Sequence, residues 1–194
     1  MLILVRHGQT AHNASRRLLG RLDLPLDDLG LTQAEALGKV DLLRDADRVI
    51  SSPLTRARST AAALGPSITI DARWVEIDYG IYDGMPLTDV PAELWRQWSQ
   101  DPSWTPEGGE SLAEVGRRVR AACEEVWAEA AEKDIVVVSH VTPIKAAVAW
   151  VLGLGDDVSW RMILETAAVC QIDKGRMGGP SLRTFNETHY RPSA

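Results

Sequence analysis

Short runs of apolar residues recur along the chain, and polar residues bound each of them. They span residues 2–5, 47–51, 68–71 and 135–139. Runs of this length and composition are typical of strands that are covered on both faces. Longer segments with a helical spacing of apolar positions lie between them. The pattern therefore predicts an alternation of strands and helices.

Each predicted helix begins at a residue type that caps helix N-termini. Some starts fit a capping box with a glutamate three residues later, and others place a proline directly after the capping residue. The predicted helices, with their capping residues, are 32–43 (Thr32), 52–64 (Ser52), 111–133 (Ser111) and 142–154 (Thr142).

Alternating strands and helices with long crossovers predict an α/β fold, a three-layer α/β/α sandwich around a mainly parallel sheet. Two extended runs, 168–173 and 181–185, flank a glycine-rich turn and predict an antiparallel hairpin at one edge of that sheet. Residues 73–109 are rich in Asp, Gly, Pro and Trp, which predicts a cap-like excursion over the carboxyl ends of the strands. The length favours a single domain over 1–194.

Composition and charge exclude several classes of protein. The chain is 45% apolar and 25% charged, as globular proteins are, and its net charge of −6 argues against a nucleic-acid partner. No segment is long and apolar enough to span a bilayer, so we expect no membrane partner and a cytoplasmic location. Cys123 and Cys170 lack the spacing of zinc ligands, which predicts buried free thiols and no metal site.

Histidines follow two of the predicted strands directly. His7 comes after the strand 2–5, and His140 comes after the strand 135–139. Because α/β proteins place their chemistry at the carboxyl ends of parallel strands, we expect both imidazoles in one pocket. Arg6 adjoins the first histidine, and Arg56 lies in the first turn of the helix after the second strand, where an anion would offset the positive helix dipole.

These residue types suit phosphate chemistry. Guanidinium groups match phosphate oxygens, which makes Arg6 and Arg56 candidate ligands, and Thr10 and Asn13 can add uncharged donors. A neutral imidazole can attack phosphorus when its other ring nitrogen is held protonated. A carboxylic acid among apolar neighbours can protonate the leaving oxygen. Glu76 has such neighbours in the sequence.

Other assignments stay open for some of these groups. Asp78 and Asp83 lie close to Glu76 in the sequence and could take its place. Trp95 and Trp98 have the i, i+3 spacing of packed helical side chains, although they could also line a substrate entrance. The run 117–120, with three arginines, favours the solvent-facing side of the longest helix.

Four motifs in this order resemble those of the histidine phosphatase superfamily: LVRHGQT with Asn13, SSPLTRA at 51–57, Glu76 with Tyr79-Gly80, and Val138-Ser139-His140. The resemblance implies that His7 becomes phosphorylated. It implies phosphate contacts from Arg6, Asn13 and Arg56, with His140 as the second pocket histidine. It also implies that Glu76 is the proton donor.

One position departs from the family pattern. Glycines often follow the second histidine, whereas this chain has Val141 and Thr142, and a β-branched residue restricts the backbone there. The sequence SHVTPIK at 139–145 resembles those of the acid phosphatase and alpha-ribazole phosphatase-like branch.

The resemblance implies a metal-independent phosphomonoesterase without a cofactor, acting on a small phosphorylated metabolite. A phosphoglycerate mutase and a non-catalytic phospho-ligand binder are the alternatives. The identity of the leaving group stays open. So does a homodimer, which exposed tryptophans or an edge strand could support.

Overall fold

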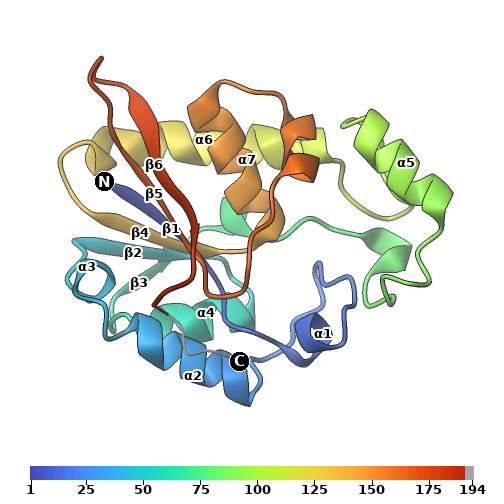
Figure 1. Cartoon of the computed structure of the whole chain (residues 1–194), viewed down its shortest axis with the longest axis horizontal. Helices are drawn as coiled ribbons and strands as arrows, with labels where there is room; N and C mark the ends of the chain where they lie inside the picture. The colour runs from blue at the N-terminus through green and yellow to red at the C-terminus, as the bar shows by residue number, and fades with distance from the viewer. Residues whose placement is uncertain (191–194) are drawn as a thin grey trace.

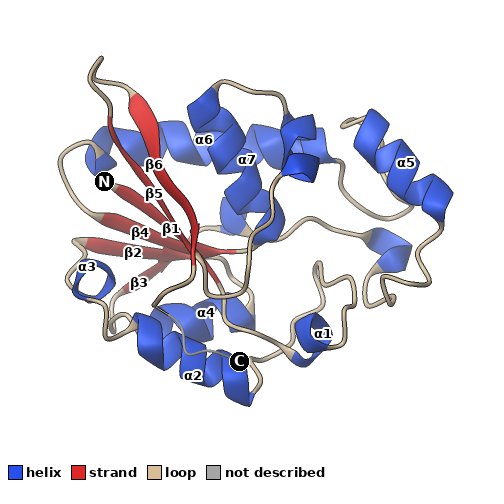
Figure 2. Ribbon diagram, in the orientation of Figure 1, coloured by secondary structure: helices blue, strands red, loops and turns tan. Residues whose placement is uncertain are grey.

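The computed structural model describes residues 1–190, in which a six-stranded sheet separates two layers of helices (Figures 1 and 2). The strand order across the sheet is β3-β2-β4-β1-β5-β6. The strands are β1 (Leu2–Arg6), β2 (Arg48–Ser51), β3 (Ile68–Ile70), β4 (Ile135–Ser139), β5 (Val169–Lys174) and β6 (Pro180–Glu187).

The sheet is parallel except at one edge. β1 pairs with β4, β4 with β2 and β2 with β3 in parallel, whereas β5 runs antiparallel to both β1 and β6. The predicted α/β sandwich with an antiparallel edge hairpin is thereby confirmed. In the parallel register Arg6 lies opposite Ser139, so the residues that follow β1 and β4 meet at one edge of the sheet.

Helices cover both faces of the sheet (Figure 2). Alternate residues of β1 point to opposite sides: Leu2 and Leu4 pack in the cluster with α6 and α7, and Ile3 and Val5 pack in the cluster with α2 and α4. The α-helices are α1 (Ala11–Ala14), α2 (Asp28–Leu37), α3 (Asp41–Arg44), α4 (Thr55–Ala62), α5 (Ala92–Gln100), α6 (Leu112–Ala130) and α7 (Val141–Leu152). Within residues 1–190, none of them has both the length and the hydropathy needed to cross a bilayer.

The segment 73–109 extends away from the sheet and carries α5 at its far end (Figure 1). Short 3-10 helices, η1 (Ala72–Trp74) and η2 (Gly80–Tyr82), form its first part. It has an apolar cluster of its own around Leu94 and Trp98. The predicted single domain includes residues 191–194, which lie outside the described residues, and its extent stays a prediction.

Three predicted helix starts are wrong, and each has a physical reason. The predicted helix 32–43 is two helices, and α2 begins after Asp27, whose carboxylate accepts the Gly30 amide at 2.8 Å. α4 begins at Thr55 rather than after Ser52, because Asp23 accepts both the Thr55 amide and its hydroxyl from a distant loop. Long-range contacts of this kind leave no local signal in the sequence. The third wrong start, at α7, belongs to the functional site. By contrast, the capping box at Ser111 is present as predicted.

We predict that Asp27→Ala lowers the free energy of unfolding by about 1 kcal/mol, because the first turn of α2 loses its capping acceptor. Thr32→Ala is the matched control, since Thr32 is exposed within the helix and only bonds back to the Asp28 carbonyl. Urea unfolding followed by circular dichroism measures both variants. A larger loss of unfolding free energy for Thr32→Ala than for Asp27→Ala would instead indicate that the helix begins at Thr32.

Candidate active site

Both predicted histidines lie at the carboxyl edge of the parallel strands and face one another. The ring centroids of His7 and His140 are 5.0 Å apart in an edge-to-face arrangement. The buried Arg56 guanidinium lies against both, with its Nε 3.2 Å from His7 Nε2 and 3.2 Å from His140 Nδ1. Residues from three distant segments therefore converge as the sequence predicts.

The shared Arg56 donor decides the protonation of both rings. An arginine Nε carries a proton and can only donate, so both imidazole nitrogens facing it are acceptors. His7 must then be protonated at Nδ1, which donates to the Gly8 carbonyl at 2.7 Å. His140 is protonated at Nε2, which donates to Ser52 Oγ at 2.7 Å. The lone pair of His7 is thus held on Nε2.

The environment keeps both imidazoles neutral. Burial lowers the pKa of His7 well below its usual range, and the positive charges of Arg56 and Arg6 lower it further. Burial and the Arg56 charge act in the same direction on the pKa of His140. A neutral imidazole with a fixed proton on one nitrogen is the form that can act as a nucleophile.

Arg6 brings a buried positive charge to the same place. Its Nη1 donates to the Leu164 carbonyl at 2.6 Å, while its buried Nε has no partner among residues 1–190. Burial lowers the pKa of Arg6 to about 10, and the charge of Glu76 opposes that shift, so the group stays charged at neutral pH. An unpaired buried donor on a cation is a place for an anion.

Arg56 lies deeper in the protein than a side chain that contacts the contents of the cavity. Its Nη1 and Nη2 donate to the carbonyls of Leu22 and Gly20 at 2.8 and 2.7 Å, so it holds the loop before α2 against the histidines. The expected anion at the start of α4 is the Asp23 carboxylate. Arg56 and His140 lie beneath the cavity rather than on its wall, and their predicted contacts with substrate stay a prediction.

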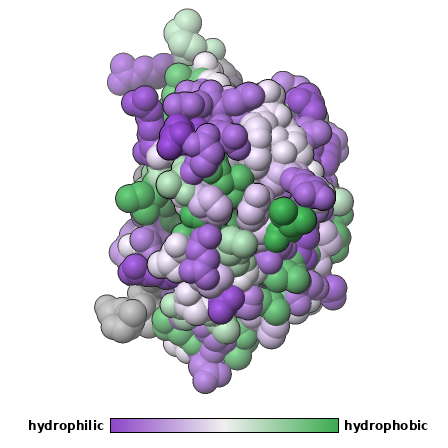
Figure 3. Space-filling model, turned by 90° about the vertical axis from the view of Figure 1, so that its right-hand side faces the viewer, coloured by the Kyte–Doolittle hydropathy of each residue, from purple (hydrophilic) through white to green (hydrophobic). Residues whose placement is uncertain are grey.

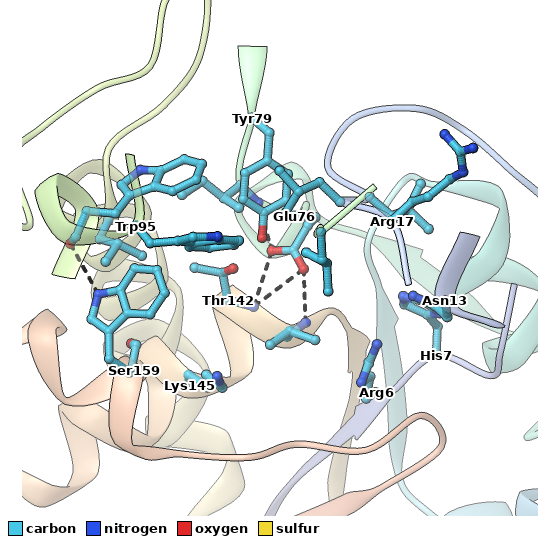
Figure 4. A pocket seen from close by; sticks show the side chains of 18 residues that line it. Arg6, His7, Asn13, Arg17, Glu76, Tyr79, Trp95, Thr142, Lys145 and Ser159 are labelled. Carbon is cyan, nitrogen blue, oxygen red and sulfur yellow. Dashed lines mark hydrogen bonds between the residues drawn. The ribbon is translucent and has the colours of Figure 1, made fainter. Parts of the chain in front are cut away.

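Glu76 lies at the N-terminus of α7. Its two oxygens accept the amides of Val141 and Thr142 at 3.1 to 3.4 Å, and the Ile77 amide at 2.8 Å (Figure 4). The predicted cap at Thr142 is therefore wrong. His140 is the N-cap residue, and it needs no capping side chain because a carboxylate from another segment satisfies the first amides.

The uncharged candidates divide into two positions. Thr10 and Asn13 form a capping box at α1, in which Asn13 Oδ1 accepts from the Thr10 amide and hydroxyl. Asn13 lies on the cavity wall near His7 (Figure 4), whereas Thr10 is fully buried and does not line the cavity. The substrate contacts of both stay a prediction.

A cavity of about 340 Å³ opens over His7. Its floor is formed by Arg6, His7 and the start of α7, and its far wall comes from the cap. Among residues 1–190, Glu76 is the one carboxylate on the wall. Asp78 and Asp83, the alternative candidates, instead accept backbone amides of Gly80 and of residues 20–22.

Three tryptophans line the cavity, two from the segment 73–109 and one, Trp160, from outside it. Trp95 and Trp98 pack together with ring centroids 5.7 Å apart, and Trp160 contacts Trp95 at 5.9 Å and donates to the Trp98 carbonyl. The pair thus packs as its spacing predicts and also lines the cavity. At the cap end of the molecule, hydrophobic side chains lie among hydrophilic ones (Figure 3).

Sequence reasoning missed several residues that shape the site. Lys145 and Arg17 both line the cavity. For Lys145 a signal existed, because it lies one turn after Val141 on a helix that starts at the site. Arg118 is not solvent-facing as the run 117–120 suggests. It donates to the carbonyl of Arg73 and to the Glu110 carboxylate, which secures the segment that carries Glu76.

Gly8 lies in a close contact between two segments of backbone. A Cβ atom at Gly8 would lie 2.5 Å from the Gly30 carbonyl oxygen, and one at Gly30 would lie 2.0 Å from the Gln9 carbonyl oxygen. The loop after β1 and the first turn of α2 therefore touch backbone to backbone. This contact holds the backbone that follows β1 in place, and His7 belongs to that stretch of backbone.

No group of three or more His, Cys, Asp or Glu side chains that could hold a metal ion occurs within residues 1–190. Cys123 and Cys170 are buried free thiols, as the sequence predicts.

Fold and site together define an α/β protein with a cationic pocket at the carboxyl edge of its parallel strands. Over residues 2–188 the sequence matches the histidine phosphatase superfamily (branch 1), and the chain belongs to that family. The resemblance found in the four motifs is thereby confirmed.

Similar proteins include phosphatases. The glucosyl-3-phosphoglycerate phosphatase of Mycolicibacterium vanbaalenii is 36% identical, and the match covers 84% of this chain and 78% of that protein. The mycobacterial glucosyl-3-phosphoglycerate phosphatase Rv2419c in complex with VO3 has a similar structure. Its TM-score is 0.84 and its identity 31%, with 96% of this chain and 99% of that chain covered.

A longer relative is the bifunctional protein Rv2228c of Mycobacterium tuberculosis. It is 36% identical over 197 residues, and the match covers 97% of this chain and 54% of that protein. The chain therefore spans about half the length of this relative.

The neutral imidazoles predict a pH-dependent stability. As the pH falls through about 6.5, each histidine takes up a proton in the unfolded chain, whereas His7 and His140 stay neutral in the fold. The unfolded state then binds more protons, so the free energy of unfolding falls with pH below about 6.5, by about 1.4 kcal/mol per pH unit for each histidine.

Urea unfolding between pH 7.5 and pH 5.5 measures this slope. In His140→Gln one of the two groups is removed, so we expect the free energy of unfolding to fall by about 1.4 kcal/mol less over this pH range than in the wild type. Equal slopes in the wild type and the variant would contradict a neutral, buried His140.

Proposed function

We propose that this protein is a phosphomonoesterase that hydrolyses a small phosphorylated metabolite through a phosphohistidine on His7. The observation that carries the proposal is the state of the His7 ring. Its Nδ1 proton is fixed on the Gly8 carbonyl, and its Nε2 carries no proton, beside a cavity that is lined by three cationic side chains, Arg6, Arg17 and Lys145. The family and the phosphatase relatives support the same activity.

In the first step the phosphate monoester binds with its oxygens near Arg6 and Asn13. His7 Nε2 gives up the hydrogen bond that it accepts from Arg56 Nε and attacks phosphorus as the bond from phosphorus to the leaving oxygen breaks. Glu76, in its protonated form, gives its proton to that oxygen, so the alcohol leaves neutral. Arg6, with Arg56 and His140 beneath it, stabilises the charge on the phosphoryl group.

In the second step water attacks the phosphohistidine. The Glu76 carboxylate takes a proton from this water as the bond between phosphorus and Nε2 breaks, and inorganic phosphate forms. His7 returns to its neutral form and Glu76 to its protonated form. The amides of Val141 and Thr142 give the carboxylate a defined place between the two steps.

Other predictions from the sequence accompany this proposal. A cytoplasmic location and a homodimer stay predictions. In the mutase alternative the phosphohistidine passes its group to a second hydroxyl, so 3-phosphoglycerate would yield an isomer rather than free phosphate. In the binder alternative no phosphomonoester would turn over.

We predict that His7→Ala lowers kcat by at least about 10³-fold, because the nucleophile is lost. The acid-labile phosphoenzyme, trapped with labelled substrate and acid quench, should also disappear. His12→Ala is the matched control, since His12 lies outside the cavity, and we expect its turnover to stay within about twofold. Normal activity of His7→Ala would exclude the nucleophile assignment.

We predict that Glu76→Gln affects substrates according to their leaving group. An alkyl phosphate needs protonation of its leaving oxygen, so its kcat should fall by about 10²-fold or more, whereas p-nitrophenyl phosphate should lose much less. Asp78→Asn is the control, because its carboxylate lies outside the cavity. An equal loss for both substrates in Glu76→Gln would contradict the role as acid.

A further inference from the structure

Lys145 is a cation of the cavity that the proposed chemistry does not use. It lies one turn into α7, on the same side of the helix as Val141, and both residues line the cavity. Every other lysine of the chain is exposed, whereas Lys145 is half-buried. In Figure 4 Lys145 and Ser159 lie on the opposite side of the cavity from His7 and Asn13, and Glu76 lies between the two sides.

The Lys145 ammonium has no acceptor of its own. Among residues 1–190 no hydrogen bond or ion pair joins it to another group, and the carboxylate of the cavity, Glu76, is bound to the amides of α7. Burial lowers the pKa of Lys145, although the charge of Glu76 opposes the shift. A partly desolvated ammonium without a counter-ion favours the binding of an anion.

The leaving group of the substrate must point to this side. Phosphorus lies near His7, and the leaving oxygen must lie within reach of Glu76, the proton donor. The remainder of the alcohol therefore extends past Glu76 toward Lys145 and the tryptophans. Ser159 and Thr142 line the cavity as well, and both carry neutral hydroxyl groups that can donate.

We propose that Lys145 binds a carboxylate on the leaving group, so that the preferred substrates are phosphate monoesters of small hydroxy acids. This inference rests on the proposed phosphatase function. One ammonium with neutral donors beside it matches the single charge of a carboxylate, whereas a second phosphate group would need more positive charge. The Trp95 and Trp98 rings cover the apolar part of the alcohol.

Two substrates that differ only in this group test the proposal. 3-Phosphoglycerate carries a carboxylate where glycerol 3-phosphate carries a hydroxymethyl group. We expect wild-type kcat/KM to be about tenfold or more higher for 3-phosphoglycerate, and Lys145→Met to lower that ratio by about tenfold or more. The loss should fall on KM more than on kcat, because the contact is present in both the ground state and the transition state.

Matched variants separate charge from structure. Lys39→Met removes an exposed lysine that follows the C-terminus of α2 and should leave the ratio of the two substrates at the wild-type value. Lys145→Arg keeps the charge and should restore part of the ratio lost in Lys145→Met. Thermal unfolding of each variant shows whether it is folded.

The outcomes distinguish this inference from the proposed function. If p-nitrophenyl phosphate is hydrolysed but Lys145→Met leaves the ratio unchanged, the carboxylate site is wrong and the phosphatase stands. If both substrates lose equally and inhibition by inorganic phosphate weakens by the same factor, Lys145 binds the phosphate instead, and the proposal is overturned.

If no phosphomonoester turns over, the proposed function is wrong, and binding measurements then test whether Lys145 binds a carboxylate. Calorimetric titration of His7→Ala with the two compounds should then show tighter binding of 3-phosphoglycerate. That difference should be lost when Lys145→Met is added. Equal affinities for the two compounds would overturn the inference.

Discussion

One N–H group orders the centre of this structure. Arg56 Nε donates to both His7 and His140, so a single donor from α4 fixes the protonation of two imidazoles from two different strand ends. The same guanidinium binds the carbonyls of Gly20 and Leu22. The two histidines and the loop before α2 therefore share one buried anchor, and none of them can move without breaking a charge-assisted hydrogen bond.

The two helices that begin at the site are capped from a distance. Asp23 satisfies the start of α4, and Glu76 satisfies the start of α7. In both cases the donors of the first turn hold a carboxylate that belongs to another part of the chain. Such capping ties the N-termini of α4 and α7 to residues of the segments that surround the site. For Glu76 it also places the carboxylate between the His7 side of the cavity and its aromatic side.

Local patterns predicted the parts of the fold that depend on local physics. The apolar runs ending at His7 and His140 gave the parallel strands, and the capping box at Ser111 gave the start of α6. The predicted starts of α4 and α7 are wrong because carboxylates from distant segments cap these helices, whereas α2 begins at a local cap, Asp27, earlier than the predicted Thr32. For the site, the strand ends and the motifs predict that His7, His140 and Arg56 lie together. They do not predict how deeply each side chain is buried beneath the cavity, because that depends on packing. For Lys145 the one signal in the sequence is its place one turn after Val141, and its half-buried position appears only in three dimensions.

The contact between Gly8 and Gly30 has a consequence for how mutations in this protein are interpreted. Gly30 carries no functional group, yet any side chain there would collide with the backbone that bears the nucleophile. In a survey of inactivating substitutions, this position would rank beside the reacting residues. Loss of activity at a residue of this protein therefore reports the placement of the backbone as well as chemistry, and only the folding and binding properties of each variant tell the two apart.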